Sequence, residues 1–156
     1  MIDDELKMGD NVSDMEKFDF NDVDIKQRLV AENKLAFAFL NKMPIVPGHT
    51  LICPKQPVAL SSELTSGMWR DILFLKDIVC AKLMKILHAK GFNFAWNEDL
   101  VAGQTVPHFH LHVVPRKEND SGIVQYEPRV FLYRPGTRAD SPKEELIALS
   151  KELRDV

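Results

Sequence analysis

Three histidines stand at alternate positions near the middle of the second half of the chain. Residues 108–112 read HFHLH, so one large apolar residue separates each imidazole from the next. A period of two is typical of a β-strand, in which successive side chains point to opposite faces. We therefore predict a strand over 108–114 that carries His108, His110 and His112 on one face. The other face would enter the core with Phe109, Leu111 and Val113.

Metal binding is one chemistry open to such a row. Zinc takes histidine nitrogens at about 2.0–2.1 Å, and two histidines at positions i and i+2 of a strand can share one ion. The outer two, however, would lie roughly 13 Å apart at Cα, at about 3.3 Å per residue. Binding a single ion with all three histidines would strain their side chains. We predict no metal ligands, with a site completed by His49 as the open alternative.

Two further chemistries need no protein-bound metal. Imidazole titrates near neutral pH, so the row could perform acid–base catalysis. Imidazole can also attack phosphorus and carry a phosphoryl or nucleotidyl group as a covalent intermediate. In either case the middle histidine, His110, is flanked by imidazoles that could orient it.

A glycine-containing loop just before the row favours the phosphorus chemistry. Residues 102–106 read AGQTV. Gly103 would let backbone amides approach an anion, and Gln104 and Thr105 would supply neutral hydrogen-bond donors. Such donors can stabilise the charge that shifts during displacement at phosphorus.

Length and composition bound the remaining possibilities. The 156 residues are 45% hydrophobic and 28% charged, which predicts one globular domain with its own core. Residues 1–24 carry nine acidic and two basic side chains, leaving +4 for the other 132 residues. This mild basicity would suit a small anion and is too weak for a nucleic-acid partner. We read residues 1–20 as an acidic, mobile or loosely docked extension and residues 21–156 as the single domain.

The placement of Cys53 and Cys80 and the apolar runs bear on location. Two cysteines without a CxxC pair predict neither a disulfide scaffold nor a cysteine zinc site. No apolar run approaches the roughly 20 residues that span a bilayer, and no secretory signal is recognisable. We expect a cytoplasmic protein with no membrane partner.

The remaining pattern predicts an α+β fold, a mainly antiparallel five-stranded sheet with one long helix across it. A helical turn over 22–29 is expected first, with a possible short strand at 130–133. Further strands are predicted over 28–32, 35–40, 49–53 and 92–96, the last an antiparallel neighbour of the histidine strand.

The helix predictions include their ends. Apolar spacing predicts the long helix over 66–90, with Ser66 as N-cap, Gly91 just past its end and His88 as a cap or surface residue. Ser141-Pro142-Lys143-Glu144 reads as a capping box that opens a C-terminal helix reaching Arg154.

The stretch AGQTVPHFHLHVVPR resembles the signature of the histidine triad (HIT) family. FLNKMPIVPGH at 39–49, Asn97 and the Gly103-Gln104 pair agree in order and spacing, so the resemblance covers about residues 28–116. Asn41, the GQTV loop and the PRK after the triad make the chain similar to the fragile-histidine-triad branch. The chain departs from many relatives at Asp99, where they carry glycine.

The resemblance implies a role for each of these residues. His110 would attack the α-phosphorus, His112 would contact phosphate and leaving-group oxygens, and His108 and His49 would hold the array. Substrate would be bound by Asn41 at the ribose, by Asn97 near the scissile phosphates, and around the α-phosphate by Gly103, Gln104, Thr105 and Val106.

The implied activity is hydrolysis of dinucleoside polyphosphates, such as diadenosine polyphosphates, through a nucleotidyl-histidine. A divalent cation, Mg²⁺ or Mn²⁺, would accompany the substrate, with no tightly bound cofactor. Family members are usually homodimers, so a homodimer is expected. Adenosine phosphoramidase activity and a nucleotide-binding signalling module are the alternatives.

Overall fold

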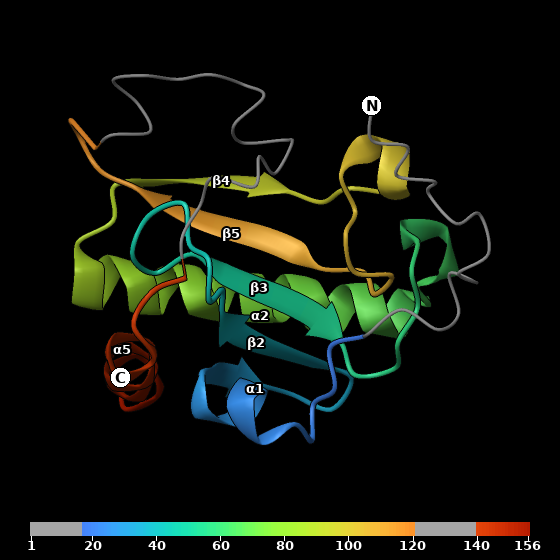
Figure 1. The fold of residues 1–156 in the computed structure, drawn as a ribbon, viewed down its shortest axis with the longest axis horizontal. Coiled ribbons are helices and arrows are strands. Elements are labelled where there is room, and N and C mark those ends of the chain that lie inside the picture. Colours follow the sequence, from blue (N-terminus) through green and yellow to red (C-terminus); the bar gives the residue numbers. More distant parts are fainter. Residues whose placement is uncertain (1–16, 121–139) are drawn as a thin grey trace, which may run out of the picture.

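Five antiparallel strands form one sheet in the order β1-β2-β3-β5-β4, and a long helix runs across it (Figure 1). The structure is a computed structural model that describes residues 17–120 and 140–156. Its elements are α1 (Val23–Gln27), β1 (Leu29–Glu32), β2 (Ala36–Leu40), β3 (Thr50–Pro54), η2 (Ser61–Glu63), α2 (Ser66–Leu87), β4 (Gly91–Ala95), η3 (Leu100–Ala102), β5 (Leu111–Arg116) and α5 (Lys143–Arg154). The predicted α+β architecture is confirmed. The short strand proposed at 130–133 lies outside the described residues.

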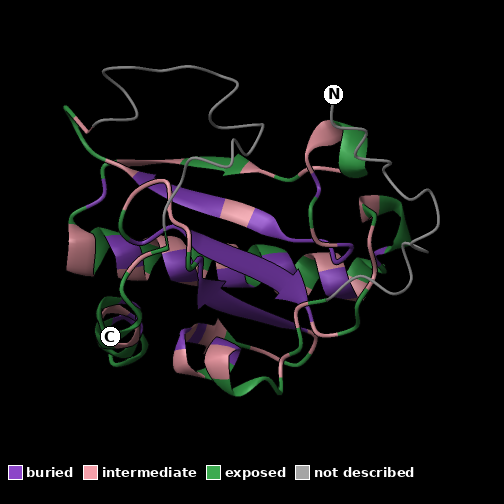
Figure 2. Ribbon diagram, viewed as in Figure 1, coloured by how far each residue is buried: buried purple, intermediate pink, exposed green. Residues whose placement is uncertain are grey.

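The predicted pairing of strands is also observed. β1 and β2 form a hairpin, and β4 lies antiparallel to β5 with Phe94 opposite Val113. Strands β2 and β3 are buried along their whole length (Figure 2). Both faces of these strands must therefore be covered, which explains their nearly continuous apolar sequences.

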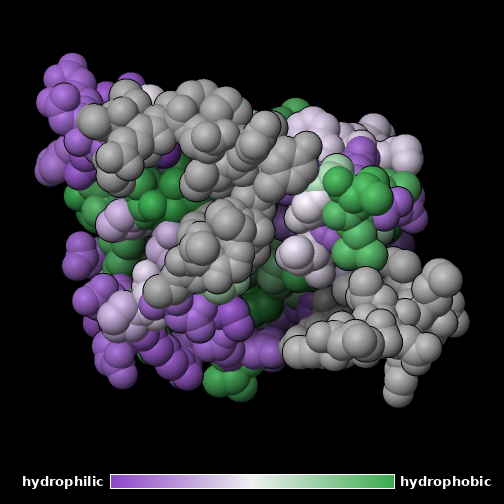
Figure 3. Space-filling view, turned by 45° about the horizontal axis from the view of Figure 1, so that its top comes forward, coloured by the Kyte–Doolittle hydropathy of each residue, from purple (hydrophilic) through white to green (hydrophobic). Residues whose placement is uncertain are grey.

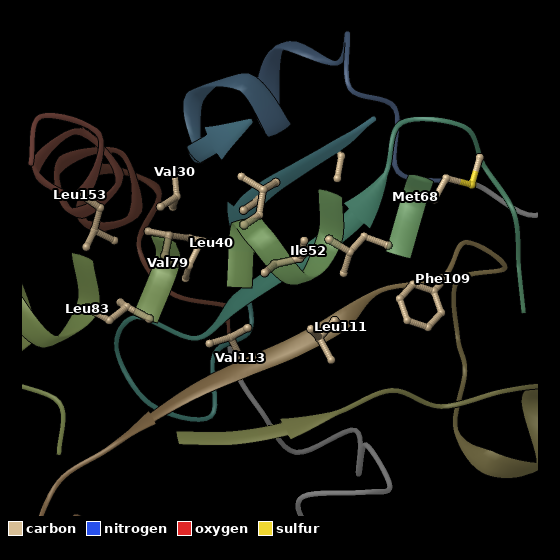
Figure 4. Close-up of a cluster of buried hydrophobic side chains, with 14 of the residues drawn as sticks. Val30, Leu40, Ile52, Met68, Val79, Leu83, Phe109, Leu111, Val113 and Leu153 are labelled. Carbon is tan, nitrogen blue, oxygen red and sulfur yellow. The ribbon is translucent and has the colours of Figure 1, made fainter. Parts of the chain in front are cut away.

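Helix α2 covers one face of the sheet. The residues that it buries recur every three or four positions, at Met68, Ile72, Leu75, Val79 and Leu83. They meet inward-facing side chains of the sheet, including Leu111 and Val113 (Figure 4). Each such side chain stabilises the fold by about 1.5–3 kcal/mol on burial. Within the described residues, no helix is long and apolar enough to cross a membrane.

Both ends of α2 differ from the prediction. Thr65, not Ser66, is the N-cap, and its hydroxyl accepts a hydrogen bond from the Met68 amide at 3.2 Å. At the other end His88 is the C-cap in the left-handed conformation, with φ 57°, and Gly91 already begins β4. The expectation that His88 is a cap is confirmed. Thr65 and Ser66 are adjacent and both of a type that favours the N-cap, so only the backbone geometry distinguishes them.

The capping box predicted for the C-terminal helix is wrong. Pro142 is the N-cap of α5, and no side chain caps the helix. The backbone amide of Ser141 instead donates to the Lys42 carbonyl at 2.8 Å. This contact ties the start of α5 to the loop after β2. Tertiary docking, rather than a local cap, therefore positions this helix.

The opposite face of the sheet is covered by the segment before β1. Ile25 of α1 packs against Phe37, Phe39 and Leu51, together with half-buried residues that include Phe18. The predicted domain boundary after residue 20 leaves Phe18 outside the domain, whereas its ring lies on β2, with its centroid 5.2 Å from that of Phe39. This is the face that carries the histidines.

Candidate active site

The histidine strand is shorter than predicted. β5 begins at Leu111, so His108 and His110 lie before it. The amide of Phe109 donates to the Val58 carbonyl and that of His108 to the Val106 carbonyl, which takes this stretch out of the β-ladder. The alternation of faces still holds, because Phe109, Leu111 and Val113 enter the core under α2.

Hydrogen bonding determines which nitrogen of His110 can act as a nucleophile. Its Nδ1 atom lies 2.7 Å from the backbone carbonyl of His108, and a carbonyl only accepts, so Nδ1 carries the hydrogen. In neutral imidazole the lone pair is then on Nε2. The ring is 6% exposed and lines a cavity. This arrangement prepares Nε2 for attack on an electrophile in that cavity.

His108 is a buried residue that holds the segment in place. Its Nε2 atom donates to the Pro54 carbonyl at 2.7 Å, at the end of β3. Its ring contacts the rings of Phe18 and Phe37. Desolvation lowers the pKa of His108 below its ordinary value, although the hydrogen bond to Pro54 opposes this shift. The neutral form is therefore favoured.

His112, at the other end of the row, forms a hydrogen-bonded pair with His49. The Ile45 amide donates to Nδ1 of His49 at 3.0 Å, so the hydrogen of His49 is on Nε2. That atom lies 2.9 Å from Nδ1 of His112 and donates to it. His112 then carries its own hydrogen on Nε2. His49 is fully buried and His112 only partly, so His112 is the member that can reach a ligand.

A cavity of about 260 Å³ opens beside His110. Its walls come from the segment before β1, from α1, from the ends of β2 and β3 and from the loop before β5. The lining residues are Lys17, Phe18, Asp22, Asp24, Ile25, Arg28, Phe39, Asn41, Lys42, Met43, Leu51, Thr105, Val106 and His110. Apolar walls with a few polar groups are typical of a small-molecule site.

Asn41 lines this cavity directly after β2. Its Oδ1 atom accepts a hydrogen bond from the Met43 amide at 3.0 Å, which fixes the side chain. Its buried Nδ2 atom has no hydrogen-bond partner among the described residues. A buried donor without a partner is costly, so a ligand acceptor at this point would stabilise the site.

The loop before the histidines uses its polar groups differently from the prediction. The side chain of Gln104 accepts from the Asp99 amide and donates to the Ala59 carbonyl, at 2.8 Å each. The Gly103 and Gln104 amides bond to the carbonyls of Leu100 and Asp99. These bonds shape the loop from inside, and Thr105 and Val106 are the loop residues that border the cavity.

Asn97 lies outside the cavity lining. Its Nδ2 atom lies 3.4 Å from the Gly103 carbonyl, so it contacts the same loop. Asp99 adopts φ 71° and ψ 159°, a region that is almost restricted to glycine. The loop thus keeps the backbone geometry of a glycine at a position where this chain has aspartate.

Several residues that line the cavity were not expected from the sequence. Phe18 is the most important, because its ring centroid lies 5.3 Å from that of His110. The acidic composition of the first 24 residues hid this contribution. The two aromatics of Phe18-Asp19-Phe20, one residue apart, were the available signal, since both rings are half-buried against the sheet.

A family comparison identifies the chain. The model of the HIT domain matches residues 22–119, which is more than half of the sequence. The chain belongs to the HIT domain family. The predicted resemblance to this family is confirmed.

Relatives and solved structures agree with this assignment. A Dictyostelium discoideum protein named bis(5'-adenosyl)-triphosphatase is 32% identical over 78% of this HIT chain and 79% of its own length. An Arabidopsis thaliana protein named bifunctional bis(5'-adenosyl)-triphosphatase/adenylylsulfatase FHIT is 36% identical over 55% of the chain and 48% of its own length. The structure of Plasmodium falciparum diadenosine triphosphate hydrolase shares the fold, with a TM-score of 0.71 at 23% identity over 94% of this chain and 86% of that one.

Within residues 17–120 and 140–156, no group of three or more His, Cys, Asp or Glu side chains is arranged to hold a metal ion. The rings of His49 and His112 are instead linked to each other, and those of His108 and His110 are linked to backbone carbonyls. Each histidine nitrogen that these bonds involve is already engaged in the protein.

Proposed function

We propose that this HIT protein hydrolyses dinucleoside polyphosphates through a nucleotidyl-histidine intermediate on His110. The observation that carries the proposal is the hydrogen bond from His110 Nδ1 to the His108 carbonyl, which leaves the nucleophilic lone pair on Nε2 beside the cavity. Relatives named as bis(5'-adenosyl)-triphosphatases support the substrate class.

The reaction proceeds in two displacements. The His110 Nε2 lone pair attacks the α-phosphorus, a P–N bond forms, and the bond to the leaving nucleoside diphosphate or longer polyphosphate breaks. His112, with its hydrogen on Nε2, donates a hydrogen bond to the leaving oxygen, which departs as the anion. Water then attacks the same phosphorus and releases its proton to solvent, the P–N bond breaks, and the nucleoside monophosphate leaves with His110 regenerated.

The other site residues bind the substrate or hold the catalytic groups in position. The unsatisfied Nδ2 of Asn41 donates to the ribose, and Thr105 and Val106 border the α-phosphate. His108 positions the nucleophile through its carbonyl, and His49 sets the tautomer of His112. Asn97, Gly103 and Gln104 act by shaping the loop. A divalent cation, Mg²⁺ or Mn²⁺, accompanies the polyphosphate and neutralises part of its charge.

The chain assembles as a homodimer through the β4 side of the sheet. β4 is an edge strand, and an open edge pairs readily with a second strand. Large apolar side chains are exposed on and near it, where Figure 3 shows hydrophobic surface at the end that carries η3. They are Phe94, Trp96, Leu100 and Val101. Sedimentation of the intact protein should give twice the chain mass, and a monomer at micromolar concentration would contradict this assembly.

Mass spectrometry of the quenched enzyme tests the mechanism. With diadenosine triphosphate, an adenylylated peptide containing residues 108–112 is expected. His110→Asn should abolish it and lower turnover by about 10⁴-fold or more, while nucleotide binding survives. The matched control is His88→Asn, because His88 lies away from the cavity and asparagine tolerates its left-handed backbone. Full turnover in His110→Asn would overturn the mechanism, and a strong preference for an aminoacyl-adenosine phosphoramidate would replace the substrate class.

A further inference from the structure

A salt-bridged pair lines the same cavity as His110. Arg28 and Asp24 both line the cavity, and Arg28 Nη2 lies 3.2 Å from Asp24 Oδ2. A series of ring contacts leads to the pair from the nucleophile. Phe18 contacts His110, Phe39 contacts Phe18, and the Arg28 guanidinium lies 5.3 Å from the centroid of the Phe39 ring. The pair is thus two aromatic rings away from the reacting nitrogen.

The inference rests on the proposed function, which decides which part of the nucleotide lies beside Arg28 and Asp24. With the α-phosphorus at His110 and the ribose at Asn41, the base must extend further into the cavity. There the apolar walls, Phe18, Ile25, Phe39 and Leu51, can contact the faces of a planar ring. The edge of that ring would meet the charged pair.

The Arg28 guanidinium has a hydrogen-bond donor that no described residue accepts. Nη1 donates to the Leu40 carbonyl and Nη2 to Asp24, but the buried Nε has no partner among the described residues. The residue is only 6% exposed, so this cation is expensive to bury without further acceptors. Asp24 is 47% exposed and also faces Lys143, whose Nζ lies 3.8 Å from Oδ1. Its carboxylate retains capacity to accept from a ligand.

We propose that Arg28 and Asp24 read the base and give the site a preference for guanine. The guanine edge presents an acceptor, O6, followed by two donors, N1–H and N2–H. Arg28 can donate to O6 while the Asp24 carboxylate accepts from both donors. Adenine presents a donor, the N6 amino group, where guanine has O6, and an acceptor, N1, where guanine has N1–H. In the same orientation it therefore matches neither Arg28 nor Asp24. The i,i+4 pair therefore selects a base in addition to supporting α1.

Titration calorimetry of the full chain with mononucleotides tests the preference. We expect GMP to bind at least about tenfold more tightly than AMP, because adenine cannot make the charge-assisted hydrogen bonds that guanine makes. IMP, which keeps O6 and N1–H but lacks the N2 amino group, should bind more weakly than GMP and more tightly than AMP. Asp24→Asn should reduce the GMP-to-AMP ratio to near one. Glu32→Gln, which removes the same charge from a residue paired with Lys55 outside the cavity lining, should keep it.

Equal binding of GMP and AMP to the wild-type protein would overturn the inference, as would an unchanged ratio in Asp24→Asn. A purely structural pair would change the stability of the protein but not this ratio. Hydrolysis distinguishes this failure from failure of the proposed function. If diadenosine triphosphate is cleaved as fast as diguanosine triphosphate, the hydrolase stands and the base preference falls. If neither is cleaved, the hydrolase falls, and the mononucleotide ratio still decides the base.

Discussion

The Nε2 atom of His49 lies 2.9 Å from the Nδ1 atom of His112, although 63 residues separate them in the sequence. Because the Ile45 amide occupies Nδ1 of His49, this hydrogen bond has one direction, from His49 to His112. The tautomer of a partly exposed histidine is therefore set by a fully buried one.

Replacing His49 should damage catalysis more than substrate binding. His49→Ala removes the donor to His112, so that ring loses its fixed tautomer and orientation. We expect kcat to fall by about 100-fold with little change in KM, because a small misplacement of a catalytic group has a cost of this order. Steady-state kinetics measures kcat and KM separately. An increase in KM with kcat unchanged would show that His49 binds substrate instead.

Burial of His108 should make the stability of the protein depend on pH. Its pKa is lower in the folded protein than in the unfolded chain, mainly through desolvation. Below the ordinary pKa of about 6.5, the unfolded chain binds more protons and is favoured. The contribution of His108 is therefore fully present above pH 6.5 and is lost as the pH falls through the folded pKa.

Urea titrations at pH 7.5 and 5.5 measure this dependence. The free energy of unfolding should decrease at pH 5.5, and the decrease should be smaller in His108→Gln, whose amide can still donate to the Pro54 carbonyl. An equal decrease in both proteins would assign the pH dependence to other groups.

Gly48 should be intolerant of any side chain. Its φ is +91°, and a Cβ there would lie 2.5 Å from Leu87 Cδ1 and 3.0 Å from Leu83 Cδ2. Gly48→Ala should lower the free energy of unfolding by about 2 kcal/mol and lower activity, because it displaces the neighbouring His49. The matched control is Gly91→Ala, where a Cβ meets nothing within 4 Å. Thermal melts of both variants are sufficient, and equal effects would contradict the argument.

Replacing Asp99 with glycine should stabilise the folded protein. Its backbone conformation costs a residue with a Cβ about 1–3 kcal/mol. The Asp99 carboxylate recovers part of this cost, because Oδ1 accepts from the Leu100 amide at 2.6 Å. We expect Asp99→Gly to raise the free energy of unfolding by about 1 kcal/mol in urea titrations. Asp99→Ala, which keeps the strain and loses the hydrogen bond, should lower it. If Asp99→Ala were more stable than the wild-type protein, this account of backbone strain at residue 99 would be wrong.

Local patterns predicted most of the architecture. Period-two and period-3.6 spacing predicted the strands and helices, because each pattern must place one face in the core. The errors lie at element ends. Ser66 and Thr65 are equivalent N-cap candidates in sequence, and the Ser141 amide is bound by the Lys42 carbonyl, 99 positions earlier in the chain. Such contacts depend on how elements dock, which no local pattern encodes.

The sequence by itself determined the chemistry available to this HIT protein: a histidine row, the face that it occupies and the loop that precedes it. Only the tertiary structure decided how each histidine is used. The carbonyl of His108 holds the hydrogen on Nδ1 of His110, and His49 determines the tautomer of His112. Phe18 lies in the acidic first 24 residues and Arg28 just before β1, and only the fold places both of them at the cavity of His110. A tautomer depends on a hydrogen-bond partner, and a cavity on the packing of distant segments, so both arise only when the chain has folded.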